Sequence, residues 1–113
     1  MIRFNFTPKT VCWVHQGGDL INALAVSDLS SPDIHIYDGK GTGEKLHTIK
    51  IHMKPVTMMA YSATLNISLS IDEMGMLEYW SGPKTGYAFP TNVSFEYKSD
   101  TDLYELTKFM AAL

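Results

Sequence analysis

The chain has 113 residues, a formal net charge of −3 and a sequence pI near 5.7. With 45% hydrophobic and 19% charged residues, its composition is that of a globular protein and not of a disordered segment. Eight lysines and Arg3 are scattered along the chain, so no basic stripe predicts binding to nucleic acid or to an anionic membrane.

Cys12 is the only cysteine, which excludes an internal disulfide and favours a reducing compartment, either cytoplasmic or nuclear. No apolar run approaches the roughly 20 residues that span a bilayer. We therefore expect a soluble protein without a membrane partner.

Alternating apolar and polar residues, separated by turn residues, predict antiparallel strands in the first half of the chain. Residues 1–9 are an N-terminal extension that is too short to interpret. The predicted strands cover 10–15, 20–26, 34–37 and 46–51. Short loops join them, so they are expected to form one four-stranded sheet.

The second half repeats this order after a connector at 52–55. Strands are predicted at 56–61, 65–70 and 76–80, and an extended segment at 87–97 is interrupted by Pro90. Because proline cannot donate to a ladder, this last segment is expected at a sheet edge. Apolar residues at helical spacing then predict a short amphipathic helix over 99–113.

The two halves also align with each other. Tyr37 matches Trp80 and Gly39 matches Gly82, both at an offset of 43 residues. Repeats of about 40–45 residues with four short strands are typical of propeller blades. The predicted fold is an all-β propeller fragment, residues 10–98, with blades at about 10–51 and 52–97. A small β-sandwich is the alternative.

Four residues of the second half invite a catalytic interpretation: His52, Ser70, Asp72 and Trp80. Serine, histidine and aspartate are the components of a nucleophilic triad, but no nucleophile elbow accompanies them. We expect a structural hydrogen-bond network across the blade, and no catalytic residues.

The sequence gives little support for a metal site, a cofactor site or a phosphate-binding loop. The four histidines match no zinc spacing, so neither a metal nor a cofactor is expected. The glycines of residues 39–43 lead into a strand and offer no helix N-terminus to a phosphate. The methionines at 53, 58, 59, 74 and 76 are expected to fill gaps in the core, with an adaptable binding surface as the alternative. Phe89, Phe95 and Tyr97 are the candidate partner surface, because aromatic residues are enriched in interfaces; packing on the neighbouring blade is the alternative.

Three segments go beyond periodicity: IHIYDGKGTGEKLHTI, GMLEYWSGP and FPTNVSFEYKSDTDLYELTK. They closely resemble the WD-repeat region of the nuclear, cyclophilin-type peptidylprolyl isomerase domain and WD repeat-containing family, over residues 10–108. The resemblance implies nuclear localisation, with the cytoplasm as the alternative, and protein partners from the spliceosome. It implies no small-molecule substrate and no direct contact with nucleic acid.

The resemblance further implies a protein–protein scaffold, part of a propeller that acts in pre-mRNA splicing. A cyclophilin active site resembles an apolar groove with an essential arginine, and the only arginine here, Arg3, lies outside the matching segment. The chain is therefore expected to lack the isomerase domain and to be no enzyme. The alternatives are peptidyl-prolyl isomerase activity and an independent β-sandwich interaction module. Within the repeat, Asp72 lies two positions earlier than usual, which puts the four-residue network in doubt.

Overall fold

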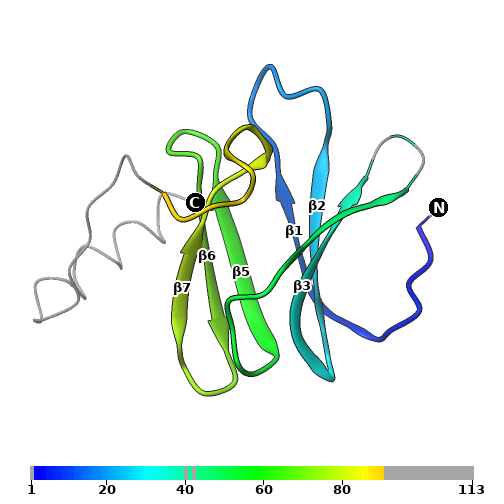
Figure 1. The fold of residues 1–113 in the computed structure, drawn as a ribbon, viewed down its shortest axis with the longest axis vertical. Helices are drawn as coiled ribbons and strands as arrows, with labels where there is room; N and C mark the ends of the chain where they lie inside the picture. Colours follow the sequence, from blue (N-terminus) through cyan, green and yellow to red (C-terminus); the bar gives the residue numbers. More distant parts are fainter. Residues whose placement is uncertain (1, 40, 42, 91–113) are drawn as a thin grey trace, which may run out of the picture.

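The computed structural model describes residues 2–39, 41 and 43–90, and this part of the chain is all-β (Figure 1). The elements are β1 (Pro8–Val14), β2 (Ala23–Asp28), β3 (Ser31–Asp38), β4 (Lys45–Ile49), β5 (Val56–Ser62), β6 (Ile67–Asp72), β7 (Leu77–Trp80) and the 3-10 helix η1 (Pro83–Thr85). None of the helices described here is long and apolar enough to cross a membrane.

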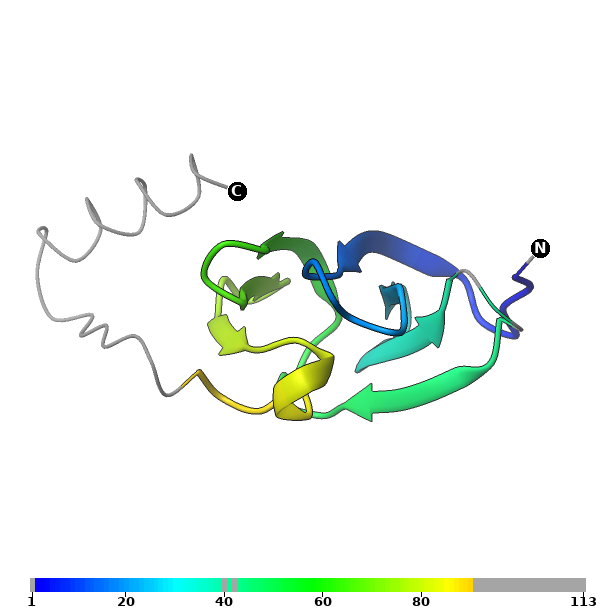
Figure 2. The ribbon, with the colours of Figure 1, turned by 90° about the horizontal axis from the view of Figure 1, so that it is seen from above.

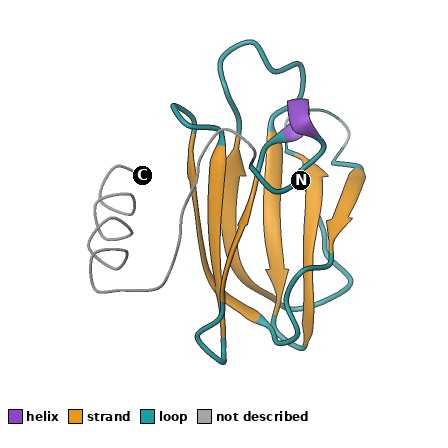
Figure 3. Ribbon diagram, turned by 60° about the vertical axis from the view of Figure 1, so that its left-hand side comes forward, coloured by secondary structure: helices purple, strands orange, loops and turns teal. Residues whose placement is uncertain are grey.

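The strands form two antiparallel sheets (Figure 3). One sheet has the order β1-β2-β3-β4 and the other has the order β5-β6-β7. In both, each strand pairs with the next strand along the chain. Tyr37 and Trp80, which the 43-residue offset aligns, lie on the third strand of the first and second sheet, respectively.

The two sheets stand next to each other, with β1 beside β5 (Figure 2). The core lies between them and combines residues of both sheets: Val14, Ala23, Ala25, Ile34, Ile36 and Ile49 from the first, and Val56, Met59 and Trp80 from the second. Polar bonds join the sheets as well, since the Ser27 hydroxyl donates to the Val56 carbonyl at 2.9 Å.

The alternation in β3 explains how the first sheet acquires two apolar faces. Ile34 and Ile36 belong to the core between the sheets. His35 and Tyr37 alternate with them and contact the N-terminal segment, with Phe6 4.4 Å from His35 between ring centroids and Phe4 5.0 Å from Tyr37. Residues before β1 therefore cover the outer face of this sheet.

Two strands begin at least two residues later than the sequence predicts. β2 begins at Ala23, after a turn in which the Asp19 carboxylate accepts a hydrogen bond from the Gln16 amide at 2.8 Å and a bend at residues 20–21. β6 begins at Ile67 because Asn66 has a positive φ of 54° and ends the preceding turn. Residues 87–90 are described and are not in a strand. The rest of the predicted edge segment and the predicted helix lie outside the described residues.

Candidate functional site

His52 and Asp72 form a buried pair between the connector and the end of β6. His52 Nδ1 lies 3.0 Å from Asp72 Oδ2, and the two side chains are 0% and 2% exposed. The second oxygen of Asp72 accepts bonds from the backbone amides of Met74 and Met76, at 2.9 and 3.1 Å. One carboxylate thus fixes both the histidine and the β6–β7 turn.

The pair continues through Ser70 to Trp80. His52 Nε2 lies 2.7 Å from Ser70 Oγ, and Trp80 Nε1 donates to the same oxygen at 3.2 Å. The structure therefore brings all four residues together, including Asp72 at its unusual position. Asp72 lies two positions earlier than usual, but it still contacts His52. It is the last residue of β6, and from there its side chain reaches the connector that carries His52.

The direction of the hydrogen bonds follows from the donors available. The indole of Trp80 can only donate, so Ser70 Oγ accepts that bond and its hydroxyl hydrogen is free to point at His52 Nε2. With this direction, the tautomer assigned to His52 has its hydrogen on Nδ1 and donates it to Asp72. Every donor in this four-residue network then has an acceptor.

Hydrogen bonds stabilise the negative charge of Asp72, the last residue of this network. Burial by itself raises the pKa of Asp72, but the bonds from His52 and from the Met76 and Met74 amides outweigh it, so the pKa lies below its ordinary value of 3.8. The carboxylate is therefore the form that the fold stabilises.

This arrangement contains the residues of a triad but not the access that a nucleophile needs. Ser70 is 0% exposed, and Trp80 occupies a lone pair of its hydroxyl oxygen. A substrate carbonyl has no path to Ser70 Oγ without unfolding the sheet. The network therefore acts as a rigid set of hydrogen bonds that joins the connector, β6 and β7.

The expectation that the methionines fill the core is wrong for four of the five. Met53, Met58, Met74 and Met76 are 89%, 53%, 74% and 57% exposed, and Met59 is buried. The reason is their position, since three of the four lie on the connector after β4 and on the β6–β7 turn. Met53, Met74 and Met76 line an open hollow of about 340 Å³ with Ile51, which agrees with the alternative of an adaptable surface.

The histidines are separated in the fold. His35 lies against Phe6, His47 stacks on Tyr87 at 5.0 Å between ring centroids, and His52 belongs to the network. Within residues 2–39, 41 and 43–90, no three histidine, cysteine or acidic side chains are grouped to bind a metal.

The candidate partner surface is described only in part. Phe89 is 65% exposed, and its ring meets Tyr79 edge-on at 6.4 Å between centroids. Phe95 and Tyr97 lie outside the described residues. Phe89 is thus an accessible aromatic residue at the end of the second sheet.

No protein-family model matches the chain. Curated relatives match almost all of it. Peptidyl-prolyl cis-trans isomerase cyp15 of Rhizopus delemar is 47% identical over 96% of the chain and 17% of its own length. Peptidylprolyl isomerase domain and WD repeat-containing protein 1 of Mus musculus is 41% identical over 98% of the chain and 17% of its length. Peptidyl-prolyl cis-trans isomerase 9 of Schizosaccharomyces pombe is 39% identical over 96% and 18%.

These relatives are isomerases by name. The chain spans about 17% of the length of the first relatives that it matches. Their names contradict three expectations: that the chain is a WD-repeat region lacking the isomerase, that its function is a splicing scaffold, and that it is not itself an enzyme. Those expectations depended on Arg3 being the sole arginine and on the position of the matching phrases. The lack of an arginine within the matching segment was too weak a ground for excluding an activity.

Proposed function

We propose that this chain serves peptidyl-prolyl cis-trans isomerisation, as part of an isomerase. The observation that carries the proposal is the match to named isomerases at 39% to 47% identity over at least 96% of the chain. The reaction is rotation about an X–Pro peptide bond, which takes tens to hundreds of seconds without a catalyst. A protein that binds the twisted peptide more tightly than either planar form accelerates it.

The described residues offer one surface suited to an extended apolar peptide. Met53, Met74 and Met76 line an open hollow beside Asp72, and methionine side chains adapt their shape to different apolar partners. Arg3 is exposed and does not line this hollow. We propose the hollow as the place where this chain contacts a proline-containing substrate.

The test measures cis-trans exchange in a short proline peptide by NMR, first with the purified chain. A second measurement uses the Rhizopus delemar relative after its matching 109 residues are replaced by this chain. We expect faster exchange with the chain or with the chimera, and slower exchange when Met74 and Met76 are both changed to glutamate. Exchange at the uncatalysed rate with both proteins, each shown to be folded, contradicts the proposal.

We also propose that the two sheets are neighbouring blades of a β-propeller. Two features support it: each sheet is a simple meander, and aligned glycines follow the third strand of both. A β-sandwich of immunoglobulin type uses Greek-key connections instead. A crystal structure of the chimera tests the proposal, because a third sheet radially arranged beyond β7 is expected, and a closed two-sheet sandwich contradicts it.

Partners and compartment are proposed on the family resemblance: spliceosomal proteins as partners, in the nucleus, with Phe89 in the contact. The test isolates the proteins that co-purify from nuclear extract with a tagged chain and compares them with those bound to its Phe89→Ser variant. Loss of spliceosomal proteins with the variant is expected, and equal recovery with both contradicts the role of Phe89.

A further inference from the structure

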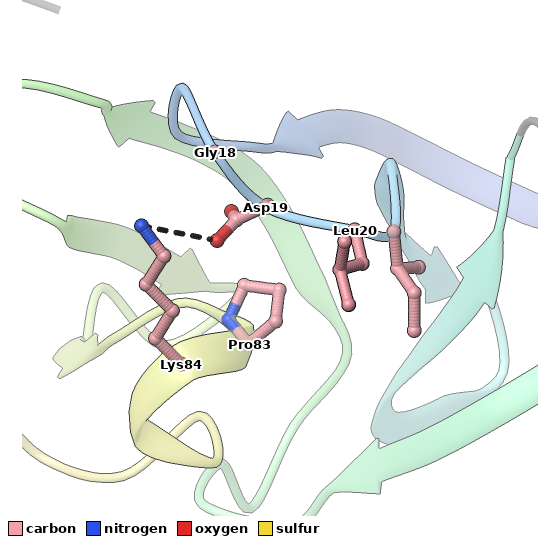
Figure 4. A pocket seen from close by; sticks show the side chains of 6 residues that line it. Gly18, Asp19, Leu20, Pro83 and Lys84 are labelled. Carbon is pink, nitrogen blue, oxygen red and sulfur yellow. Dashed lines mark ion pairs between the residues drawn. The ribbon is translucent and has the colours of Figure 1, made fainter.

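A second hollow lies at the loop end of the molecule, where η1 approaches the loop between β1 and β2 (Figure 4). Its volume is about 340 Å³. The residues that line it come from both sheets' loops: Gly18, Asp19, Leu20, Ile21, Pro83 and Lys84. The hollow therefore joins segments that are more than 60 residues apart in sequence.

A carboxylate lies in this hollow with half of its hydrogen-bonding capacity unused. The side chain of Asp19 is only 2% exposed. Its Oδ2 accepts the Gln16 amide at 2.8 Å, but its buried Oδ1 accepts no hydrogen bond from any described residue. A buried oxygen of this kind costs free energy until a donor meets it.

Lys84 compensates the charge loosely. Its Nζ lies 3.6 Å from Asp19 Oδ1 and 3.4 Å from the Gly17 carbonyl oxygen, and its side chain is 52% exposed. Charge-assisted N–H···O bonds are normally about 2.7–2.9 Å long. The Lys84 ammonium is thus half exposed and lies near two acceptors, farther from the Asp19 carboxylate than a strong charge-assisted bond would place it.

Besides burial, the charge of Asp19 contributes to the raised pKa of two nearby tyrosines. Burial, followed by the charge of Asp19, raises the pKa of Tyr61 to about 12 and also raises the pKa of Tyr87. Apolar side chains complete the rim, since Leu20 is fully exposed and Ile21 is 37% exposed. The hollow combines a negative charge that is only loosely paired with an apolar wall.

We propose that this hollow binds an arginine side chain from an extended segment of a protein partner. The planar guanidinium has diverging donors, so it can meet Asp19 Oδ1 and the Gly17 carbonyl together, which the single ammonium of Lys84 does only at long range. Leu20 and Ile21 cover an apolar residue next to the arginine. The site is separate from the methionine hollow and does not depend on isomerase activity.

The test uses the peptide acetyl-Leu-Arg-Leu-amide and the same peptide with citrulline, which keeps the shape of arginine without its charge. Titration is followed by NMR of the full chain. We expect the arginine peptide to bind at least about tenfold more tightly, and the difference to shrink with added salt. Equal affinities for the two peptides overturn the proposal. So does free arginine amide binding as tightly as the peptide, because no partner segment is then recognised.

Two variants and a control sharpen the test. Asp19→Asn keeps an oxygen for the Gln16 amide and is expected to lose the preference for arginine over citrulline. Lys84→Met removes the competing cation and is expected to tighten binding several-fold, so unchanged or weaker binding contradicts the proposal even if Asp19→Asn does not fold. Asp33→Asn changes another aspartate paired with a lysine, 2.9 Å from Lys50, and is expected to bind as the unmodified chain does.

Discussion

Ser68 and Ser70 lie two residues apart on β6 and are both 0% exposed, yet only Ser70 has hydrogen-bond partners among the described residues. Ser70 Oγ connects Trp80 to His52, and through His52 to Asp72. The two hydroxyls therefore provide a comparison in which burial and strand are the same and only the network differs.

Ser70→Ala is expected to lower the free energy of unfolding by about 1–3 kcal/mol, because the indole N–H of Trp80 loses its acceptor while it stays buried. Ser68→Ala removes a buried hydroxyl that has no partner, so it is expected to be neutral or stabilising. Urea denaturation of the two variants measures the difference. Equal losses would mean that the network does not contribute to stability.

The lowered pKa of Asp72 predicts a loss of stability in acid. Because folding favours its carboxylate, the contribution is complete above the ordinary value of 3.8 and is lost as the pH falls through the lower pKa of the folded state. Asp72→Asn is expected to be less stable than the unmodified chain at pH 7, and the gap should narrow below pH 3.8. Denaturation at pH 7 and at about pH 3 measures both gaps, and a gap that does not narrow contradicts the assignment.

Gly82→Ala is expected to destabilise the turn before η1 by about 1–3 kcal/mol. Gly82 has an ordinary negative φ, so the backbone tolerates alanine, but the added Cβ would lie 2.6 Å from Asn66 Oδ1 and 3.1 Å from the Tyr61 hydroxyl. Gly17→Ala is the control, because no atom lies within 4 Å of its Cβ position. Thermal unfolding should separate the two variants, and similar melting temperatures would show that the Asn66 side chain moves aside.

The thiol of Cys12 is expected to react slowly with iodoacetamide. Burial raises its pKa to about 11 from 9.0, so near pH 8 the reactive thiolate is about a hundredfold scarcer than in an ordinary cysteine. The rate is measured by mass spectrometry in the folded chain and again in urea. Recovery of the ordinary rate in urea is expected, and a fast reaction of the folded chain contradicts the burial of this thiol.

The local pattern located the seven described strands of the two sheets, although not all of their ends. The alternation of Ile34 and Ile36 with His35 predicts β3 and its two faces because successive side chains of a strand point to opposite sides, whatever the rest of the chain does. The 43-residue offset likewise places Tyr37 and Trp80 on equivalent strands. The expectation that the chain is no enzyme was wrong, because it relied on the lack of an arginine within residues 10–108.

What the sequence determined by itself was the class of the fold, its strands and the identities of the four network residues. Only the tertiary structure decided that Asp72 reaches His52, that four of the methionines are exposed, and that Lys84 lies over the Gly17 carbonyl 67 residues away. The physical reason is the distance along the sequence between the residues that interact. Strand periodicity depends on neighbours within a few residues, whereas these contacts depend on the pairing of strands and the packing of two sheets, which no short window of sequence contains.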